Sequence, residues 1–88
     1  MTAGRKPIRL SVHARQQAAL RGAVEEEVIA AIRTGEQAPA ERARRGYRKN
    51  FQYNREWGGR FYAVKQVLAV VAEESNELVV VTVYTFYF

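Results

Sequence analysis

The last eleven residues, Leu78 to Phe88, are the most constraining stretch of the sequence. They read LVVVTVYTFYF, a succession of β-branched and aromatic residues without a charge, a glycine or a proline. Such a run is too short to cross a bilayer as a helix, and its composition is typical of a β-strand buried on both faces. The chain must therefore supply helices to cover one face of this strand and some other cover for the second face.

Length and composition indicate one small globular domain. The chain has 88 residues, of which 48% are hydrophobic, and this suffices for a single modest core. It contains no cysteine, which excludes disulfides and thiolate metal sites and suggests the cytoplasm. Its N-terminus has no apolar segment typical of a signal peptide or anchor, and residues 1–7 are predicted to be a flexible leader. We expect one domain over residues 1–88, with no membrane association.

Two short helices are predicted in the N-terminal half. Ser11 is suited to cap the first helix, in which Ala14 and Ala18 lie one turn apart, and Gly22 is placed to end it. The second helix begins with three glutamates, where the helix dipole favours negative charge, and ends at Gly35. The two helices are therefore expected to form an αα-hairpin in which each contributes one apolar face.

From Tyr47 onward the sequence predicts strands, because the hydrophobic period changes to two. Gly58-Gly59 marks a hairpin, and the segment EESNE marks the turn into the last strand. Residues 36–46 are interpreted as a connector, and Ile8 to Leu10 as either a short edge strand or an extended lead-in. The predicted fold is α+β, with two N-terminal helices packed on an antiparallel β-meander of three to four strands.

The single histidine, His13, is a candidate for proton transfer. It falls in the first turn of the first helix, where exposed N–H groups favour a neutral imidazole. A neutral imidazole can act as a general base or accept a hydrogen bond. The alternative is a structural histidine that ties the start of the helix to a neighbouring strand.

Polar side chains within the apolar strands are further candidates. Lys65 is costly in an apolar strand unless its amine reaches water, an acid or a ligand, and the alternative to a functional role is that it extends to the sheet edge or pairs with Glu73 or Glu74. Hydroxyl groups in the last strand could line a site or make structural cross-strand hydrogen bonds. The side of that strand with the hydroxyl groups is expected to carry Val80, Thr82, Tyr84 and Phe86.

A basic and aromatic tract spans the connector and the first long strand. Its cations are Arg42, Arg44, Arg45, Arg48, Lys49 and Arg55, and its aromatic residues include Tyr47, Phe51 and Tyr53. With a net charge of +5, such a tract could follow a phosphate backbone and stack unpaired bases. The alternative is a solvated strand with its aromatic side chains in the core, which the period of two favours. The first four arginines are the candidate nucleic-acid contacts in either case.

Several other chemistries are not indicated. One histidine and no cysteine give no zinc ligand set, so no metal site is expected. No glycine-rich phosphate-binding loop is present, because the adjacent glycines are better explained by a hairpin turn. We therefore expect no cofactor.

The ordered motifs resemble those of an uncharacterised bacterial domain family of unknown function. Its pattern is S-x-H-A near the start, R-G about eight residues after the histidine, and T-V-Y in the final strand. In this chain the motifs begin at Ser11, Arg21 and Thr82, and the resemblance runs from Ile8 to Tyr84. The family in turn is similar to the RelE and BrnT toxins. This resemblance implies a RelE-like fold and a metal-independent endoribonuclease encoded with an antitoxin.

The same resemblance implies how RNA would be cleaved through attack of the ribose 2′-OH on the adjacent phosphate. His13 would transfer a proton, while Lys65 and Arg21 would stabilise the charge on the phosphorane. Tyr84 and Thr82 would orient the phosphate or transfer the second proton. RNA and a cognate antitoxin would be the partners. The alternative function is a non-catalytic module that binds a protein or a nucleic acid.

The aromatic end of the last strand also predicts an association surface. Three aromatic residues, Phe86, Tyr87 and Phe88, end the sequence with no polar tail behind them. Left exposed, such an end would favour self-association. We therefore expect a homo-oligomer formed through the C-terminal strand, or a cognate protein bound there.

Overall fold

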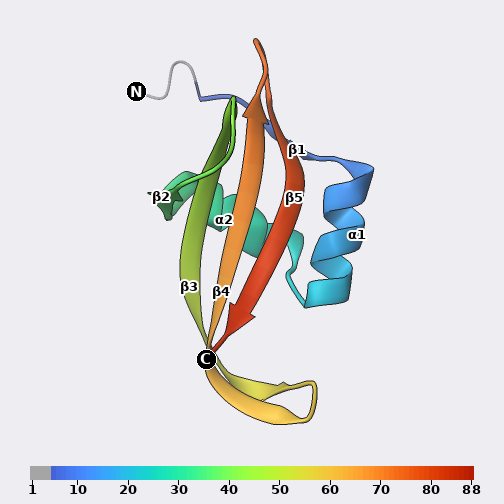
Figure 1. Ribbon diagram of the computed structural model, residues 1–88, viewed down its shortest axis with the longest axis vertical. Helices are drawn as coiled ribbons and strands as arrows, with labels where there is room; N and C mark the ends of the chain where they lie inside the picture. Colours follow the sequence, from blue (N-terminus) through green and yellow to red (C-terminus); the bar gives the residue numbers. More distant parts are fainter. Residues whose placement is uncertain (1–4) are drawn as a thin grey trace.

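The computed structural model describes residues 5–88 and contains two helices and one five-stranded sheet within them (Figure 1). The helices are α1 (Val12–Arg21) and α2 (Glu25–Thr34). The strands are β1 (Ile8–Leu10), β2 (Glu36–Ala38), β3 (Arg44–Trp57), β4 (Arg60–Glu73) and β5 (Leu78–Tyr87). The α+β class with two N-terminal helices is thereby confirmed. The first part of the predicted leader, residues 1–4, lies outside the described residues.

The sheet is larger than the predicted meander and is mixed rather than antiparallel. Its strand order is β1-β5-β4-β3-β2. The central three strands are antiparallel and sequential, as predicted, but β1 pairs in parallel with β5, and β2 adds an antiparallel edge to β3. The connector prediction was therefore wrong for β2. The three residues of β2, Glu36 to Ala38, are too few and too polar to show a hydrophobic period. They form a strand only because they pair with β3.

The ends of the helices follow the local signals in the sequence. The Ser11 hydroxyl accepts a hydrogen bond of 3.0 Å from the Ala14 amide, so it caps α1. Gly22 ends α1 with a φ of 82°, a left-handed conformation that favours glycine. At the start of α2, the Val24 amide donates to the Glu27 carboxylate at 3.1 Å, which is one half of a capping box.

Residues just before β1 are also held against the sheet. The Lys6 ammonium group bonds the Glu73 carboxylate at 2.8 Å, and the Lys6 carbonyl accepts from Arg33 at 2.8 Å. The Pro7 carbonyl accepts a hydrogen bond of 2.8 Å from the amide of Leu78 at the start of β5. This part of the predicted leader is therefore tied to β4, α2 and β5.

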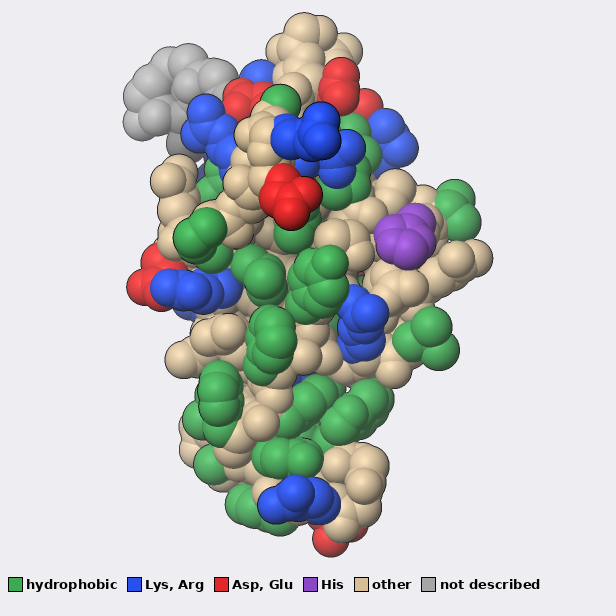
Figure 2. All heavy atoms as spheres, in the orientation of Figure 1, with side chains coloured by type: hydrophobic (Ala, Val, Ile, Leu, Met, Phe, Trp, Pro, Cys, Tyr) green, Lys and Arg blue, Asp and Glu red, His purple; other side chains and the backbone are tan. Residues whose placement is uncertain are grey.

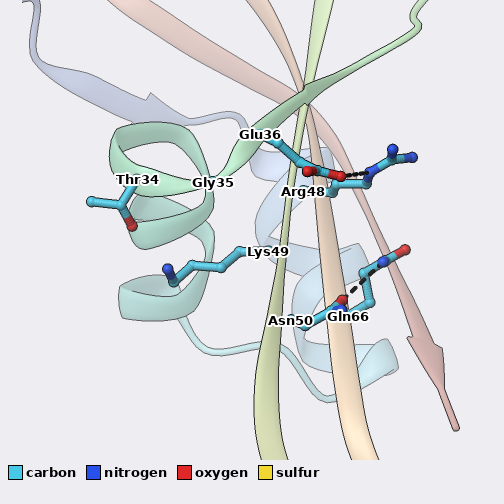
Figure 3. Close-up of a pocket in the computed structure, with 7 residues that line it drawn as sticks. All are labelled: Thr34, Gly35, Glu36, Arg48, Lys49, Asn50 and Gln66. Carbon is cyan, nitrogen blue, oxygen red and sulfur yellow. Dashed lines mark hydrogen bonds and ion pairs between the residues drawn. The ribbon is translucent and has the colours of Figure 1, made fainter.

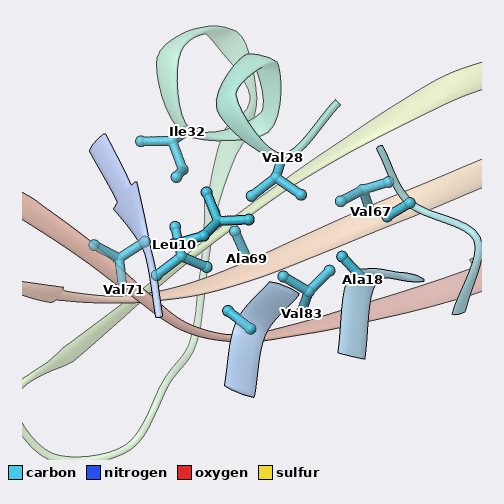
Figure 4. Packing of buried hydrophobic residues seen from close by; sticks show 11 residues of the cluster. Leu10, Ala18, Val28, Ile32, Val67, Ala69, Val71 and Val83 are labelled. Carbon is cyan, nitrogen blue, oxygen red and sulfur yellow. The ribbon is translucent and has the colours of Figure 1, made fainter. Parts of the chain in front are cut away.

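The core lies between the two helices and one face of the sheet. In Figure 1, α2 crosses behind β3 and β4, and α1 lies beside β5. Ala14 and Ala18 are both buried, and such small side chains let α1 approach the sheet closely. The aliphatic residues of the same core cluster are labelled in Figure 4 and include Leu10, Val28, Val67, Val71 and Val83. Valine and alanine fill most of this thin core.

No described helix or strand covers the other face of the sheet, so the prediction that β5 is buried on both faces was wrong. Both helices pack on the same side, and Tyr84 and Phe86 of β5 are 41% and 46% exposed on the other side. Figure 2 shows this side, with green hydrophobic side chains along its middle. We call it the open face.

A bulge in β5 decides which side chains reach the open face. Thr82 pairs with Val70 but Val80 pairs with Val71, so Val81 is an extra residue between two registers. Val80 therefore packs in the core, whereas Thr82 is on the opposite side. The prediction that they share a side was wrong, because a strict period of two allows for no inserted residue.

Candidate functional site

The structure divides the residues predicted to be catalytic between the two sides of the sheet. Lys65 is buried on the helix side, whereas Thr82 and Tyr84 are on the open face. Arg21 reaches past the edge of β5 toward that face from the last turn of α1. His13 is exposed in the first turn of α1, about 12 Å along the helix from Arg21. Figure 2 shows the histidine, in purple, on the viewer's side of the molecule.

Lys65 is occupied by structural contacts. Only 5% of the residue is exposed, and its ammonium group donates to the Gly22 carbonyl at 2.8 Å and lies 2.8 Å from the Glu27 carboxylate. It also lies 5.1 Å from the centre of the Tyr53 ring. The alternative of pairing with Glu73 or Glu74 is thus wrong, because Lys65 pairs with Glu27, and Glu73 binds Lys6 instead. Lys65 joins β4 to the connection between α1 and α2.

Arg21 is held at the edge of the open face by both its side chain and its backbone. Its guanidinium donates to the Val83 carbonyl at 2.8 Å and lies 5.0 Å from the centre of the Tyr84 ring. Its own carbonyl accepts from the Thr85 hydroxyl at 2.9 Å and from the Tyr87 hydroxyl at 2.7 Å. These contacts fix a cation against an exposed aromatic ring, an arrangement known to be favourable.

The strand register arranges the open face in rows that cross the three central strands. One row contains Arg48, Leu68 and Tyr84, and the next contains Asn50, Gln66 and Phe86. Successive rows are about 6.6 Å apart along the strands, since only alternate residues share a face. Aromatic side chains therefore follow β5, mostly apolar ones follow β4, and arginine and amide side chains follow β3.

The four candidate arginines do not form a single surface. Arg44 and Arg48 alternate on the open-face side of β3, whereas Arg45 is on the helix side, 3.8 Å from Glu73. Arg42 is in the loop before β3 and has a φ of 56°. In Figure 2, blue side chains gather above the green ones, at the end of the face where β3 begins. The sequence identified the cations, but the pleat of β3 separates them.

Most of the aromatic residues of the tract pack on the helix side. Tyr47 and Phe51 contact the hydrophobic core, as the period of two predicted. They are therefore unavailable to stack bases. On the open face, the exposed aromatic side chains are instead on β5, where Tyr84 and Phe86 alternate.

Tyr87 ends β5 in an aromatic cluster on the helix side. Its ring stacks on Trp57 with 5.2 Å between centroids, and Tyr53 and Tyr62 lie at 5.4 and 5.5 Å. Burial raises the pKa of the Tyr87 phenol. Phe88, beyond the strand, is 60% exposed. Oligomerisation, or a cognate protein that covers this end, stays a prediction.

Sequence reasoning missed a polar hollow at the outer edge of β3 (Figure 3). It has a volume of about 370 Å³ and lies between the end of α2, the start of β2 and the edge of β3. The side chains around it include Arg48, Lys49, Asn50 and Gln66. The only signal in the sequence was Gly35, which was interpreted simply as the end of a helix and not as a site of close packing.

Residues 10–85 match the model of a family described as Domain of unknown function (DUF4258). No curated protein and no solved structure matches the chain. Across residues 5–88, no three histidine, aspartate or glutamate side chains gather as metal ligands. No helix in that range is long and apolar enough to cross a membrane.

Proposed function

The chain belongs to the DUF4258 family of domains of unknown function, and we propose that it is a non-catalytic module that binds single-stranded RNA on the open face. The observation that carries the proposal is the pairing of exposed aromatic rings with cations on a sheet face that nothing in the described chain covers. Tyr84 and Phe86 alternate along β5, Arg21 lies against the Tyr84 ring, and arginines flank the face on β3.

The spacing of the aromatic residues favours unpaired bases. Tyr84 and Phe86 are about 6.6 Å apart along the strand, roughly twice the separation of stacked bases. Two bases bound to these rings would therefore be splayed apart, as they are in single-stranded RNA on sheet platforms. Stacking on an aromatic ring contributes about 1–3 kcal/mol per base. A broad sheet, by contrast, does not fit the deep and narrow major groove of an RNA duplex.

The charges of the open face favour a polyanion. Alternate positions of β3 from Arg44 to Gln52 contribute two arginines and no acid, and those of β4 from Val64 to Ala72 contribute no charge. Glu36 of β2, beside this face, is paired with Arg48 at 2.8 Å. The chain as a whole carries a net charge of +5. Phosphate groups would therefore meet cations at both margins of an uncharged aromatic and aliphatic strip.

The positions of the predicted catalytic residues favour binding over cleavage. Lys65 has its ammonium group bound to Gly22 and Glu27 and lies on the side of the sheet opposite Tyr84. His13 is about 12 Å from Arg21 along α1. A single phosphate bound at Tyr84 would therefore be far from His13, and the sheet would shield it from Lys65.

Fluorescence anisotropy with a labelled ten-nucleotide single strand and a matched RNA hairpin tests the proposal. Tyr84→Ala and Phe86→Ala should each weaken binding to the single strand at least about tenfold, since each removes a stacking surface. Phe61→Ala is the matched control, because Phe61 is 64% exposed but lies on the β3–β4 hairpin. Arg44→Gln should weaken binding. It should also make the slope of the log binding constant against the log salt concentration less steep by about 0.7.

Three outcomes would contradict the proposal. The first is no binding of the single strand in 50 mM salt, and the second is equal losses in the Phe61 and Phe86 variants. The third is cleavage of the RNA by the purified protein in EDTA. If His13→Ala also stopped this cleavage, the chain would be the metal-independent endoribonuclease that the toxin resemblance implies.

A further inference from the structure

We infer that the polar hollow at the outer edge of β3 is a subsite for one nucleotide, where a base is read by hydrogen bonds. This inference rests on the proposed function and adds a source of base preference to it. Stacking on Tyr84 and Phe86 accepts every base, because each base has a π-face. Discrimination needs donors and acceptors placed at the edge of a base.

The hollow exists because β2 is shorter than the strand that it borders. β2 pairs with β3 only from Gly46 to Arg48, so the outer edge of β3 is free beyond Arg48 in the described structure. The end of α2 closes the hollow on one side. Gly35 approaches the Arg48 carbonyl so closely that a Cβ atom would collide with it. The close packing at Gly35 thus fixes the position of α2 beside the free edge.

Backbone groups of Asn50 point into the hollow. The backbones of Val64 and Phe88 exchange two hydrogen bonds. The even-numbered residues of β4 therefore bond to β5, and the odd-numbered residues between them bond to β3. The partners on β3 are then Lys49 and Phe51, and the backbone groups of Arg48 and Asn50 point outward. β2 pairs with Arg48. The N–H and C=O of Asn50 therefore have no strand partner among the described residues, which leaves one donor and one acceptor.

Side-chain amides add to this hydrogen-bonding pattern. Gln66 donates from Nε2 to Oδ1 of Asn50 at 2.8 Å, and this bond orients both side chains (Figure 3). The remaining Gln66 carbonyl and the Asn50 amide group are free to bond a ligand. Base edges carry the same mixture of donors and acceptors. The amide pair is therefore suited to one base more than to the others.

Cations beside the amides are suited to the phosphate of the same nucleotide. Arg48 and Lys49 line the hollow from opposite sides of β3 in Figure 3. Arg48 uses Nε to bond Glu36 at 2.8 Å, which leaves its terminal nitrogens available. The volume of about 370 Å³ is near the lower end for small-molecule sites, so it suits a single nucleotide.

The register connects the hollow to the proposed RNA path. Asn50, Gln66 and Phe86 form one row across three strands that are about 4.8 Å apart. A base stacked on Phe86 would thus lie beside the amide pair, and the next nucleotide could enter the hollow. Bases would be held by stacking at β5 and read at β3.

Binding of ribonucleoside monophosphates to the ¹⁵N-labelled full chain tests the inference directly. We expect at least one of the four nucleotides to shift the side-chain amide signals of Asn50 and Gln66. The double variant Asn50→Ala/Gln66→Ala should weaken that binding at least about fivefold, because it removes two hydrogen-bonding groups. Gln52→Ala is the matched control, since this exposed amide lies on the same strand outside the hollow.

A second measurement separates this inference from the proposed function. Affinities for short homopolymers of A, C, G and U should differ for the wild type and become equal for the double variant. If RNA binding depends on Tyr84 but no nucleotide shifts the two amides, the subsite is overturned and the proposed function stands. If a nucleotide binds in the hollow but RNA affinity is independent of Tyr84, the subsite stands and the proposed function is overturned. A double variant that binds nucleotides like Gln52→Ala also overturns the subsite.

Discussion

The two faces of the sheet differ in chemistry although the same strands form both. On the helix side, Val67 and Val83 are completely buried, and Lys65, the one buried charge within residues 5–88, is paired with Gly22 and Glu27. On the open face, Tyr84 and Phe86 remain nearly half exposed. Val83 and Tyr84 are neighbours in the chain, so one peptide bond separates the two environments. The helix side contains the buried core, and the open face displays aromatic groups that are only partly buried.

This contrast predicts that substitutions on the two faces have different consequences. A substitution on the helix side should lower the free energy of unfolding and leave the RNA affinity of the folded protein unchanged. A substitution on the open face should lower the RNA affinity and leave the free energy of unfolding nearly unchanged. Three experiments test this division, beginning with the largest expected loss of stability.

Lys65→Met should cause the largest loss, about 3 kcal/mol in the free energy of unfolding. Removing one partner of a buried ion pair leaves the other with an uncompensated charge, which costs about 3–5 kcal/mol. The lower end applies because Glu27 still accepts from the Val24 amide and keeps 19% of its side chain exposed. Urea denaturation measures the change.

Lys49→Met is the matched control for that experiment. Lys49 is on the neighbouring strand, also on the helix side, but it is only half-buried. We expect its substitution to change the free energy of unfolding by about 0.5 kcal/mol or less. Equal urea midpoints for the two lysine variants would show that the bonds of Lys65 to Gly22 and Glu27 do not stabilise the fold.

Val83→Ala and Phe86→Ala should separate stability from binding within one strand. Val83→Ala should cost about 2 kcal/mol, because it removes two methyl groups from the core and leaves a void. Phe86→Ala should change the free energy of unfolding by about 0.5 kcal/mol or less, since its ring is half exposed. Urea denaturation and RNA anisotropy on the same samples give both values. Comparable losses of stability would mean that the open face is also needed for folding.

Tyr87→Phe should lower the free energy of unfolding by less than Lys65→Met or Val83→Ala does, and its effect should depend on pH. The Tyr87 hydroxyl bonds the Arg21 carbonyl, so below pH 9 the wild type should be more stable by about 1 kcal/mol. Burial raises the pKa of this phenol in the folded protein. Above about pH 10 the unfolded chain therefore loses the proton first, and the stability of the wild type falls.

The difference between wild type and Tyr87→Phe should consequently shrink as the pH rises past about 10. Urea denaturation at pH 8, 9, 10 and 11 measures it. A difference that stayed constant over this range would show that the phenol is not shielded from water by the aromatic cluster around Trp57.

The local elements of this protein could be predicted because their signals lie within a few residues. Ser11 and Gly22 delimit α1, and Gly58-Gly59 forms the hairpin with φ values of 63° and 85°. The order of the three long strands followed from short turns, which leave little choice but antiparallel neighbours. Each of these features depends on backbone sterics or on hydrogen bonds within one turn, so the sequence by itself determined them.

The candidate site could be predicted only as an inventory of side chains. Arg21, Tyr84 and the arginines of β3 were candidates at the level of the sequence and its family resemblance, but Lys65 was grouped with Arg21 and Tyr84. A lysine in an apolar strand has several ways to satisfy its charge, and only the packed structure selects Glu27. The hollow was not predicted, since its walls come from α2, β2 and β3, and Gly35 alone does not reveal what approaches it.

Tertiary structure decided which side chains share a face of the sheet and which of them are neighbours. β1 and β2 became strands because partners distant in sequence bind them, and the extra residue Val81 sent Val80 to the core and Thr82 to the open face. Strand register depends on pairing across the whole sheet, and a shift of one residue exchanges the two faces. Local sequence therefore determined the two helices and the three long strands, while long-range pairing and packing added β1 and β2 and decided that one side of β5 is buried and the other is open.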